Sequence, residues 1–317
     1  MLKLTYHIKI GNYRLQTLKS VSIKTSVLNL SDTATIELPA QYLNRWQHVE
    51  SNLEKNDEVS ISLGYNGENE VEFKGYLKSI KRNNKQLTLE CEDALCLLDK
   101  SVADKEYKSI GLRALLTDIV QQVDGEITVM CDYDFTYEKM VVFKSTALDV
   151  VKKIHEETKA NIWFDGKTLH VHPVYQEQTD VKPWVLDTER NVQSKDLEWV
   201  DKSDNKVLVE VKHIDADGKV NTKQYGVDGG KKETRYVKSV NEGDLMRVAE
   251  NEYNLWNYSG YEGTLTGWLV PRVKAGESVR LIDRKRDETG IYYVTDVEIE
   301  FGQNGAKRKV SLGRRLG

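Results

Sequence analysis

The sequence contains few cysteines, and their number is odd. Cys91, Cys96 and Cys131 are the only three among 317 residues. An odd set at these spacings provides neither a disulfide framework nor a four-ligand zinc site. The composition therefore predicts a protein that folds with reduced thiols, as in a bacterial-type cytoplasm.

Long hydrophobic segments are also missing. Lys3, Lys9 and Arg14 interrupt the N-terminal region, and the apolar run Ala94–Leu98 is far too short to cross a bilayer. We therefore expect neither signal-directed secretion nor a membrane anchor.

Charge of one sign is not in large excess. The chain holds 46 Lys and Arg against 50 Asp and Glu, a formal net charge of −4. That balance provides no polycation argument for nucleic-acid binding. The local basic clusters are typical of a solvated turn and tail, or alternatively of a phosphate contact. They comprise Lys307, Arg308, Lys309, Arg314 and Arg315.

Motifs of known site chemistry are absent from the sequence. It has no glycine-rich phosphate loop of the dinucleotide or P-loop type and no serine elbow. His170 and His172 share a predicted strand face and could hold a metal, although an ordinary polar face explains them as well. His155 could relay a proton but fits a helix surface better, and the acidic strand end Glu90–Asp93 is interpreted as solubilising charge. We predict no catalytic residue, no cofactor, no metal and no enzymatic activity.

What the sequence does contain is a strand module that occurs twice. Residues 275–316 predict three consecutive antiparallel strands joined by polar turns. Residues 58–91 repeat the same order of parts in a weaker form. A chain that carries one module twice is organised around that repetition.

Both middle strands of the module lose their alternation in the same way. Leu77 and Ile80 are three residues apart, and so are Val294 and Val297, where strict alternation requires two or four. One extra residue in a strand reverses the inward face, so a β-bulge shared by both copies would explain the pattern.

The region between the modules has a different pattern. Apolar residues recur at helical spacing over 112–123, and a second helix is expected to begin at Ser145 or Thr146. Asp165–Gly166 predicts a hairpin turn between two β-runs. Residues 108–175 are therefore expected to form a small α/β insert.

The last region returns to strands. A turn is expected at Asp217–Gly218 and one helix over Leu245–Trp256. We predict a mainly β fold with an α+β insert, in which two small similar β-barrels flank a helix–hairpin α/β domain. The expected domains are 1–107, 108–175 and 176–317.

Large aromatic residues near the last helix and strand are candidate contact residues. Trp256 and Tyr258 follow the predicted helix, and Trp268 lies in the following strand. Exposed aromatics often anchor interfaces. Burial at a junction between helix and barrel explains them equally well.

Four stretches resemble, in their order, the phage tail baseplate-hub family. This family comprises late-control protein D, gp27-like hub proteins and the N-terminal part of type VI secretion spike proteins. The stretches are LSDTATIELP at 30–39, the strand module at 56–98, the helix and hairpin at 145–173, and the closing module at 263–316. No single motif is diagnostic, and the resemblance rests on all four together.

The resemblance implies a structural hub with no chemistry of its own. Such hubs form trimers whose two similar modules per chain make a pseudo-sixfold ring, which joins a hexameric tail tube to a trimeric spike. The implied partners are two further copies, tube, spike and other baseplate proteins, with DNA only as cargo through the lumen. The implied location is a virion tail baseplate or injection-system hub assembled in the bacterial cytoplasm. The chain ends four residues after Gly313 and shows no lysozyme-type domain, so a separate spike protein is expected. The aromatic and basic residues named above would then be interface residues.

Two other functions remain compatible with the sequence. A carbohydrate- or receptor-binding tail module would also be β-rich and carry surface aromatics. A cell-wall hydrolase using paired carboxylates is the third hypothesis.

Overall fold

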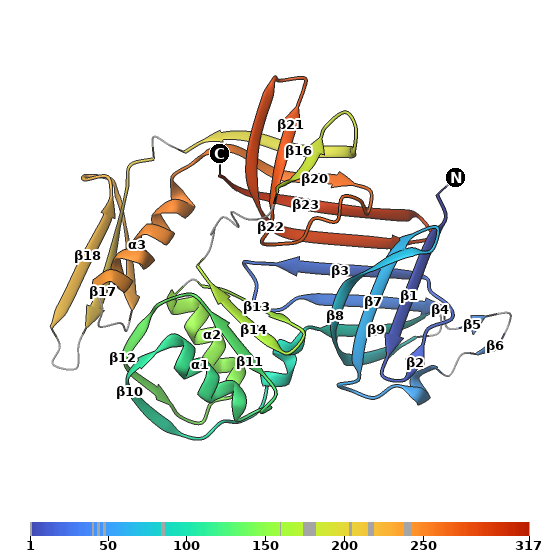
Figure 1. Ribbon diagram of the computed structural model, residues 1–317, viewed down its shortest axis with the longest axis horizontal. Coiled ribbons are helices and arrows are strands. Elements are labelled where there is room, and N and C mark those ends of the chain that lie inside the picture. The colour runs from blue at the N-terminus through green and yellow to red at the C-terminus, as the bar shows by residue number, and fades with distance from the viewer. Residues whose placement is uncertain are drawn as a thin grey trace. The chain divides into compact units, whose positions relative to one another are not determined.

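In the computed structural model the chain forms two compact units, each built from segments that are distant in the sequence (Figure 1). Unit 1 consists of Met1–Cys96, Glu177–Leu197 and Glu262–Gly317, and unit 2 of Leu97–Gln176 and Glu198–Tyr261. The residues described are 2–39, 41–42, 45–46, 49–83, 86–158, 160–173, 182–202, 205–214, 219–237 and 242–316. The predicted turn at Asp217–Gly218 lies outside them.

Unit 1 begins with a series of antiparallel strands. They are β1 (Leu4–Ile10), β2 (Tyr13–Arg14), β3 (Ser20–Ser26), β4 (Thr33–Pro39), β7 (Glu58–Tyr65), β8 (Glu68–Arg82) and β9 (Gln86–Glu92), and they pair in the order β3-β4-β9-β8-β7-β1-β2. Between them lie the short strands β5 (Gln41–Tyr42) and β6 (Arg45–Trp46) and the 3₁₀ helix η1 (Val49–Asn52), and η2 (Ala94–Leu98) follows. The helical turn expected after β9 is thus confirmed as a 3₁₀ helix.

The closing strands of the chain continue the same sheet. They are β15 (Trp184–Asp187), β16 (Val192–Asp201), β20 (Ser259–Gly267), β21 (Ser278–Asp283), β22 (Glu288–Gly302) and β23 (Gly305–Arg315). The main path of the sheet runs β16-β20-β23-β22-β3-β4-β9-β8-β7-β1-β2, with β21 pairing β22 and β15 beside β21. Because β3 pairs with both β4 and β22, the two predicted modules share one continuous sheet.

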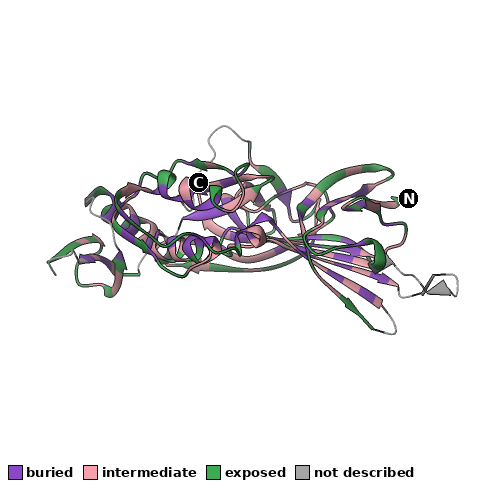
Figure 2. Ribbon diagram, turned by 90° about the horizontal axis from the view of Figure 1, so that it is seen from below, coloured by how far each residue is buried: buried purple, intermediate pink, exposed green. Residues whose placement is uncertain are grey.

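Buried residues alternate with less buried ones along the strands, as the bands of colour in Figure 2 show. In β4, Ala34, Ile36 and Leu38 are buried, and the residues between them are not. A strand places successive side chains on opposite faces, so this pattern aims one face at the core. The large share of strand and the three α-helices confirm the predicted fold class.

The bulge expected in both copies is present in both. In β8, Leu77 pairs with Cys91 and Ser79 with Glu90, which leaves one extra residue. In β22, Val294 pairs with Leu312 and Asp296 with Ser311, again with one extra residue. The phase break in the sequence is therefore the same backbone irregularity at the same place in each module.

The backbone entering the bulge is matched as well. Asn56 N donates to Leu77 O over 2.8 Å, and Gly276 N donates to Val294 O over 2.9 Å. Asn56 and Gly276 both have positive φ, 72° and 86°. Glycine and asparagine tolerate that conformation best, which explains why these two residue types occupy the equivalent turn.

Unit 2 contains the helices α1 (Leu112–Gln121), α2 (Ala147–Thr158) and α3 (Glu242–Trp256). Its sheets are β10–β12, β11–β14–β13 and β18–β17–β19. The strands are β10 (Lys105–Gly111), β11 (Thr128–Cys131), β12 (Thr136–Val142), β13 (Asn161–Asp165), β14 (Thr168–His172), β17 (Val207–Ile214), β18 (Val220–Gly226) and β19 (Lys231–Val237). The three predicted helices are confirmed, whereas β10 and β12 were not predicted.

The predicted helix cap and hairpin of unit 2 are both present, but the hairpin turn lies one residue later than predicted. Thr146 caps α2, since Asp149 N donates to Thr146 Oγ1 over 3.1 Å and Thr146 N donates to Asp149 Oδ2 over 3.0 Å. The hairpin is present, but Asp165 pairs with Thr168, so its central residues are Gly166 and Lys167.

The units do not follow the chain in order, because residues 198–261 group with 97–176 in unit 2. The division into 1–107, 108–175 and 176–317 as domains stays a prediction. None of the helices that the structure describes is long and apolar enough to span a membrane.

Candidate functional site

Arg308 is the predicted surface residue whose position the structure corrects. Alternation along β23 turns Lys307 and Lys309 outward and Arg308 inward, and Arg308 is only 3% exposed. Reading the three basic residues as one exposed turn was therefore wrong for Arg308.

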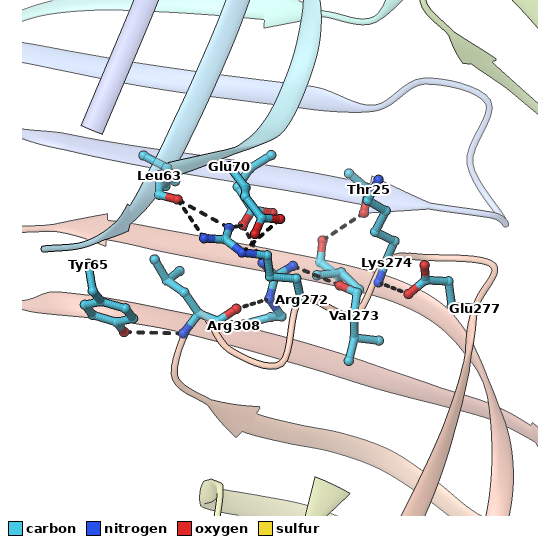
Figure 3. Close-up of polar contacts among 12 residues, drawn as sticks. Thr25, Leu63, Tyr65, Glu70, Arg272, Val273, Lys274, Glu277 and Arg308 are labelled. Carbon is cyan, nitrogen blue, oxygen red and sulfur yellow. Dashed lines mark hydrogen bonds and ion pairs between the residues drawn. The ribbon is translucent and has the colours of Figure 1, made fainter. Parts of the chain in front are cut away.

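The guanidinium of Arg308 has a partner for each of its nitrogens (Figure 3). Nε donates to Leu269 O over 3.0 Å, and Nη1 donates to Val273 O over 2.8 Å. Nη2 donates to Glu72 Oε1 over 2.7 Å. A buried arginine is tolerated only when its donors and its charge are satisfied in this way.

A second arginine completes the cluster. Arg272 Nη1 also donates to Glu72 Oε1, and Arg272 Nε lies 3.2 Å from Glu70 Oε2. Arg272 Nη1 and Nη2 both donate to Leu63 O, over 3.3 and 3.2 Å. Two arginines face two glutamates, so the cluster is electrically neutral. We name Glu70, Glu72, Arg272 and Arg308 the arginine junction.

The arginine junction joins the two strand modules within unit 1. Leu63, Glu70 and Glu72 belong to the β7–β8 hairpin, whereas Arg272 and Arg308 come from the closing module. Leu269 N additionally donates to Tyr65 Oη over 3.4 Å. The loop between β20 and β21 is therefore fixed against the first module by side chains from both copies.

The other predicted contact residues of unit 1 lie nearer the surface. Trp268 is 43% exposed. Lys307 and Lys309 are exposed and lie opposite Glu300 and Glu298 of β22. Arg314 and Arg315 are half-buried and belong to the end of β23 rather than to a free tail, and Arg315 Nη2 donates to Thr289 O over 3.2 Å.

Trp256 and Tyr258 belong to unit 2. Trp256 is 40% exposed at the end of α3, with Lys231 Nζ 5.7 Å from its ring centroid. Tyr258 is half-buried, and Lys202 Nζ lies 5.0 Å from its ring centroid. The eight predicted residues are thus divided between the units, and only the basic residues of β23 share an element.

The acidic strand end that was interpreted as solubilising charge contains one buried carboxylate. Glu90 and Glu92 pair with Lys81 and Lys78, but Asp93 is only 5% exposed. Asp93 accepts from Asp32 N over 2.9 Å and from Leu95 N over 3.0 Å. Burial raises the pKa of Asp93 to about 7 and that of Asp32 to about 6. The interpretation was therefore wrong for Asp93, which organises the chain after β9.

The histidines weighed as metal ligands form an aromatic stack. Trp163 lies parallel to His170 with ring centroids 5.0 Å apart, and His172 Nδ1 is 2.6 Å from Asp132 Oδ1. The part of the chain that the structure describes contains no group of three or more metal-ligating side chains. His155 Nδ1 lies 2.8 Å from Ala160 O, a contact that closes the end of α2.

Comparison by sequence finds no known protein, whereas comparison by structure finds several. No protein-family model matches the sequence, and the comparison with curated proteins finds no match. Solved structures are similar over almost the whole chain. A tail protein from Neisseria meningitidis MC58 has a TM-score of 0.73 at 14% identity, covering 98% of this chain and 96% of that one. The 43 kDa tail protein of prophage MuSo2 from Shewanella oneidensis has a TM-score of 0.68 at 13% identity, covering 98% of both chains.

The chain has the fold of these phage tail proteins. A third similar structure is the E. coli c3393 protein, described as a component of the type VI secretion system with structural similarity to the T4 tail proteins gp27 and gp5. Its TM-score is 0.61 at 10% identity, covering 98% of this chain and 79% of that one. The fold expected from the resemblance is thereby confirmed.

Proposed function

We propose that the chain is a structural baseplate hub protein of a phage tail or of a phage-tail-like contractile injection system. Three copies form a ring with six similar positions, which joins a hexameric tail tube to a trimeric spike. The matched bulge at Leu77 and Val294 is the observation that carries this proposal. A chain that builds one module twice, down to the same backbone irregularity, can present one type of surface twice per subunit.

The arginine junction supports the same role. It holds the two modules of unit 1 in one arrangement through the bonds of Arg272 to Leu63 O and of both arginines to Glu72. A ring with six similar positions requires the two modules of each chain to keep a constant relation. A buried ion pair in which every nitrogen of Arg308 is bonded provides that constraint more specifically than apolar contact does.

The partners follow from this role. We propose the tail tube protein, the spike and other baseplate proteins, with DNA as cargo in the lumen. Four exposed residues would take part, namely Trp256, Trp268, Lys307 and Lys309, together with the half-buried Tyr258, Arg314 and Arg315. All seven are candidate contacts predicted from the sequence.

Light scattering coupled to a sizing column tests the proposal. The expected mass is three times 36.4 kDa for the chain alone, or that mass plus the bound spike protein where the ring forms only with its partner. A monomer under all conditions would contradict a ring. Binding of purified glycans by that monomer would favour the receptor-binding module, and clearing of a peptidoglycan gel would favour a hydrolase.

A further inference from the structure

The two modules differ in one strand contact. After its bulge, β22 continues between two neighbours, since Asp296 to Gly302 pair with β3 on one side and β23 lies on the other. After its bulge, β8 pairs with β9. Of the strands that the structure describes, none pairs with the other side of β8 beyond its contact with β7.

The difference shows in burial. Val297, the second residue after the extra residue of β22, is 3% exposed and lies against β3. Ile80 holds the same position in β8 and is only half-buried. The edge of β8 at Lys78–Lys81 thus has no neighbouring strand among those described, whereas β3 covers the equivalent part of β22.

The chain also holds a strand that could supply this cover. In the first module β3 lies beside β4, which pairs with β9; in the closing module β16 lies beside β20, which pairs with β23. β16 is therefore the counterpart of β3. It is the outermost strand of the sheet, and most of its residues are exposed. The order of strands places β16 and β8 far apart within one chain, so the two edges cannot meet there.

We propose that β16 of one copy pairs antiparallel with Lys78–Lys81 of β8 in the next copy. This inference rests on the proposed ring and names the surfaces that close it. The contact repeats between chains the pairing that β3 and β22 make within a chain. Addition of a strand to an open sheet edge satisfies backbone groups on both partners and is a common mode of association. The contact joins two different surfaces, so a rotation that closes gives a ring.

Charges on the two edges are complementary. Within the chain, Lys24 of β3 lies 3.0 Å from Glu298 of β22. The β8 edge carries Lys78 and Lys81, whose partners within the chain are Glu92 and Glu90 of β9. The β16 edge carries Asp196 and Glu198 beside Lys195, which pairs with Asp283. Within the chain the basic residue lies on β3 and the acidic residue on β22, whereas in the proposed contact the basic residues lie on β8 and the acidic residues on β16. Opposite charges on paired strands stabilise the pairing.

Cysteine cross-linking tests the proposal on the full-length protein. Cys96, the half-exposed native cysteine, is first replaced by serine. Lys81→Cys is then combined with a single cysteine at each of positions 193, 194, 195 and 196 in turn. Side chains of a strand alternate between faces, so we expect disulfide-linked chains on denaturing gels at every second position of β16 and few at the others.

The matched control replaces Lys81→Cys by Lys24→Cys. Lys24 is also exposed, but β4 and β22 already occupy both edges of its strand. The same scan with Lys24→Cys should give no linked chains. Links of equal yield at all four positions, or links in the control, would show random collision and overturn the strand pairing.

Light scattering on the same samples separates this inference from the ring itself. A trimer without alternating cross-links would overturn the pairing of β16 with β8 and leave the hub proposal standing. A monomer at every concentration, with or without spike protein, would overturn both.

Discussion

Arg308 Nη2 lies 2.7 Å from Glu72 Oε1, and both side chains are almost completely buried. Removing one partner of a buried ion pair costs about 3–5 kcal/mol when it leaves the other charge without compensation. Arg272 still contacts Glu72 in Arg308→Met, so we expect a smaller loss in the free energy of unfolding, about 1–3 kcal/mol, in urea titrations. Lys309→Met, on the exposed face of the same strand, is the control and should cost less than about 1 kcal/mol.

The arginine junction should also be strongly non-additive. Glu72 accepts from both Arg272 and Arg308, so the three residues share one carboxylate. Combining Glu72→Gln with Arg308→Met should lower the free energy of unfolding by less than the sum of the two single changes. Each single change already removes the ion pair between the two residues, so the second change cannot remove it again. Additive costs in a double-mutant cycle would show that the three residues are not coupled.

The bulge in β22 determines which side chains face the core. Inserting one alanine between Asp296 and Val297, after the bulge, would move Val297, Ile299 and Phe301, all buried, to the polar face. Burial of each such side chain is worth about 1.5–3 kcal/mol, and the sum approaches the whole stability of a typical domain. We expect a protein without cooperative thermal unfolding by circular dichroism. Inserting one glycine between Gln303 and Asn304, in the turn that follows, is the control and should leave cooperative unfolding intact.

Stability should depend on pH through Asp93 and Asp32. Burial raises the pKa of Asp93 to about 7 and that of Asp32 to about 6 from an ordinary value of 3.8. The folded state therefore binds these protons more tightly than the unfolded chain. The resulting stabilisation is complete below pH about 4 and is lost as the pH rises through 6 to 7.

Asp93→Asn tests this linkage because asparagine resembles the protonated acid. The variant should lose less stability than the wild type between pH 4 and 8, by on the order of a few kcal/mol at most. Urea titrations at several pH values measure the difference. Parallel curves for the two proteins would exclude Asp93 as the source.

The N-cap of α2 offers a local prediction. Thr146 Oγ1 accepts from Asp149 N, so Thr146→Ala removes a cap and should cost about 1 kcal/mol. The neighbouring Ser145 Oγ donates to Phe143 O and does not cap the helix. Ser145→Ala is therefore the matched control, with a smaller expected loss in the same denaturation experiment.

The basic face of β23 should matter for assembly more than for folding. Lys307 and Lys309 are exposed, and neutralising both as glutamine should leave the unfolding midpoint nearly unchanged. If they contact a partner, trimer or tube binding should weaken, most strongly at low salt. Replacing Lys108 and Lys139 by glutamine removes the same charge from unit 2 and should leave assembly intact.

The bulges could be predicted from the sequence because alternation is a direct consequence of strand geometry. The spacing of apolar residues shows which side chains face the core, as for Leu77 with Ile80 and for Val294 with Val297. The Thr146 cap and the three helices could also be predicted, because the residues that determine them lie close together in the sequence.

The arginine junction could not be predicted in this way. Arg308 lies between two exposed lysines, and only the strand alternation could have indicated that it points inward. Its partner Glu72 is one of many acidic residues, and nothing local connects them. Asp93 was misread for a similar reason, because its hydrogen-bond partner Asp32 belongs to another part of the chain.

The bond between Glu72 and Arg308 spans 236 residues of sequence, and that between Glu72 and Arg272 spans 200. A ribosome therefore releases the β7–β8 hairpin long before either arginine exists. Contacts of such sequence separation form slowly because a long loop must close first. The last step in folding unit 1 must wait until the closing module has been translated, and until then Glu72 lacks both of its arginine partners.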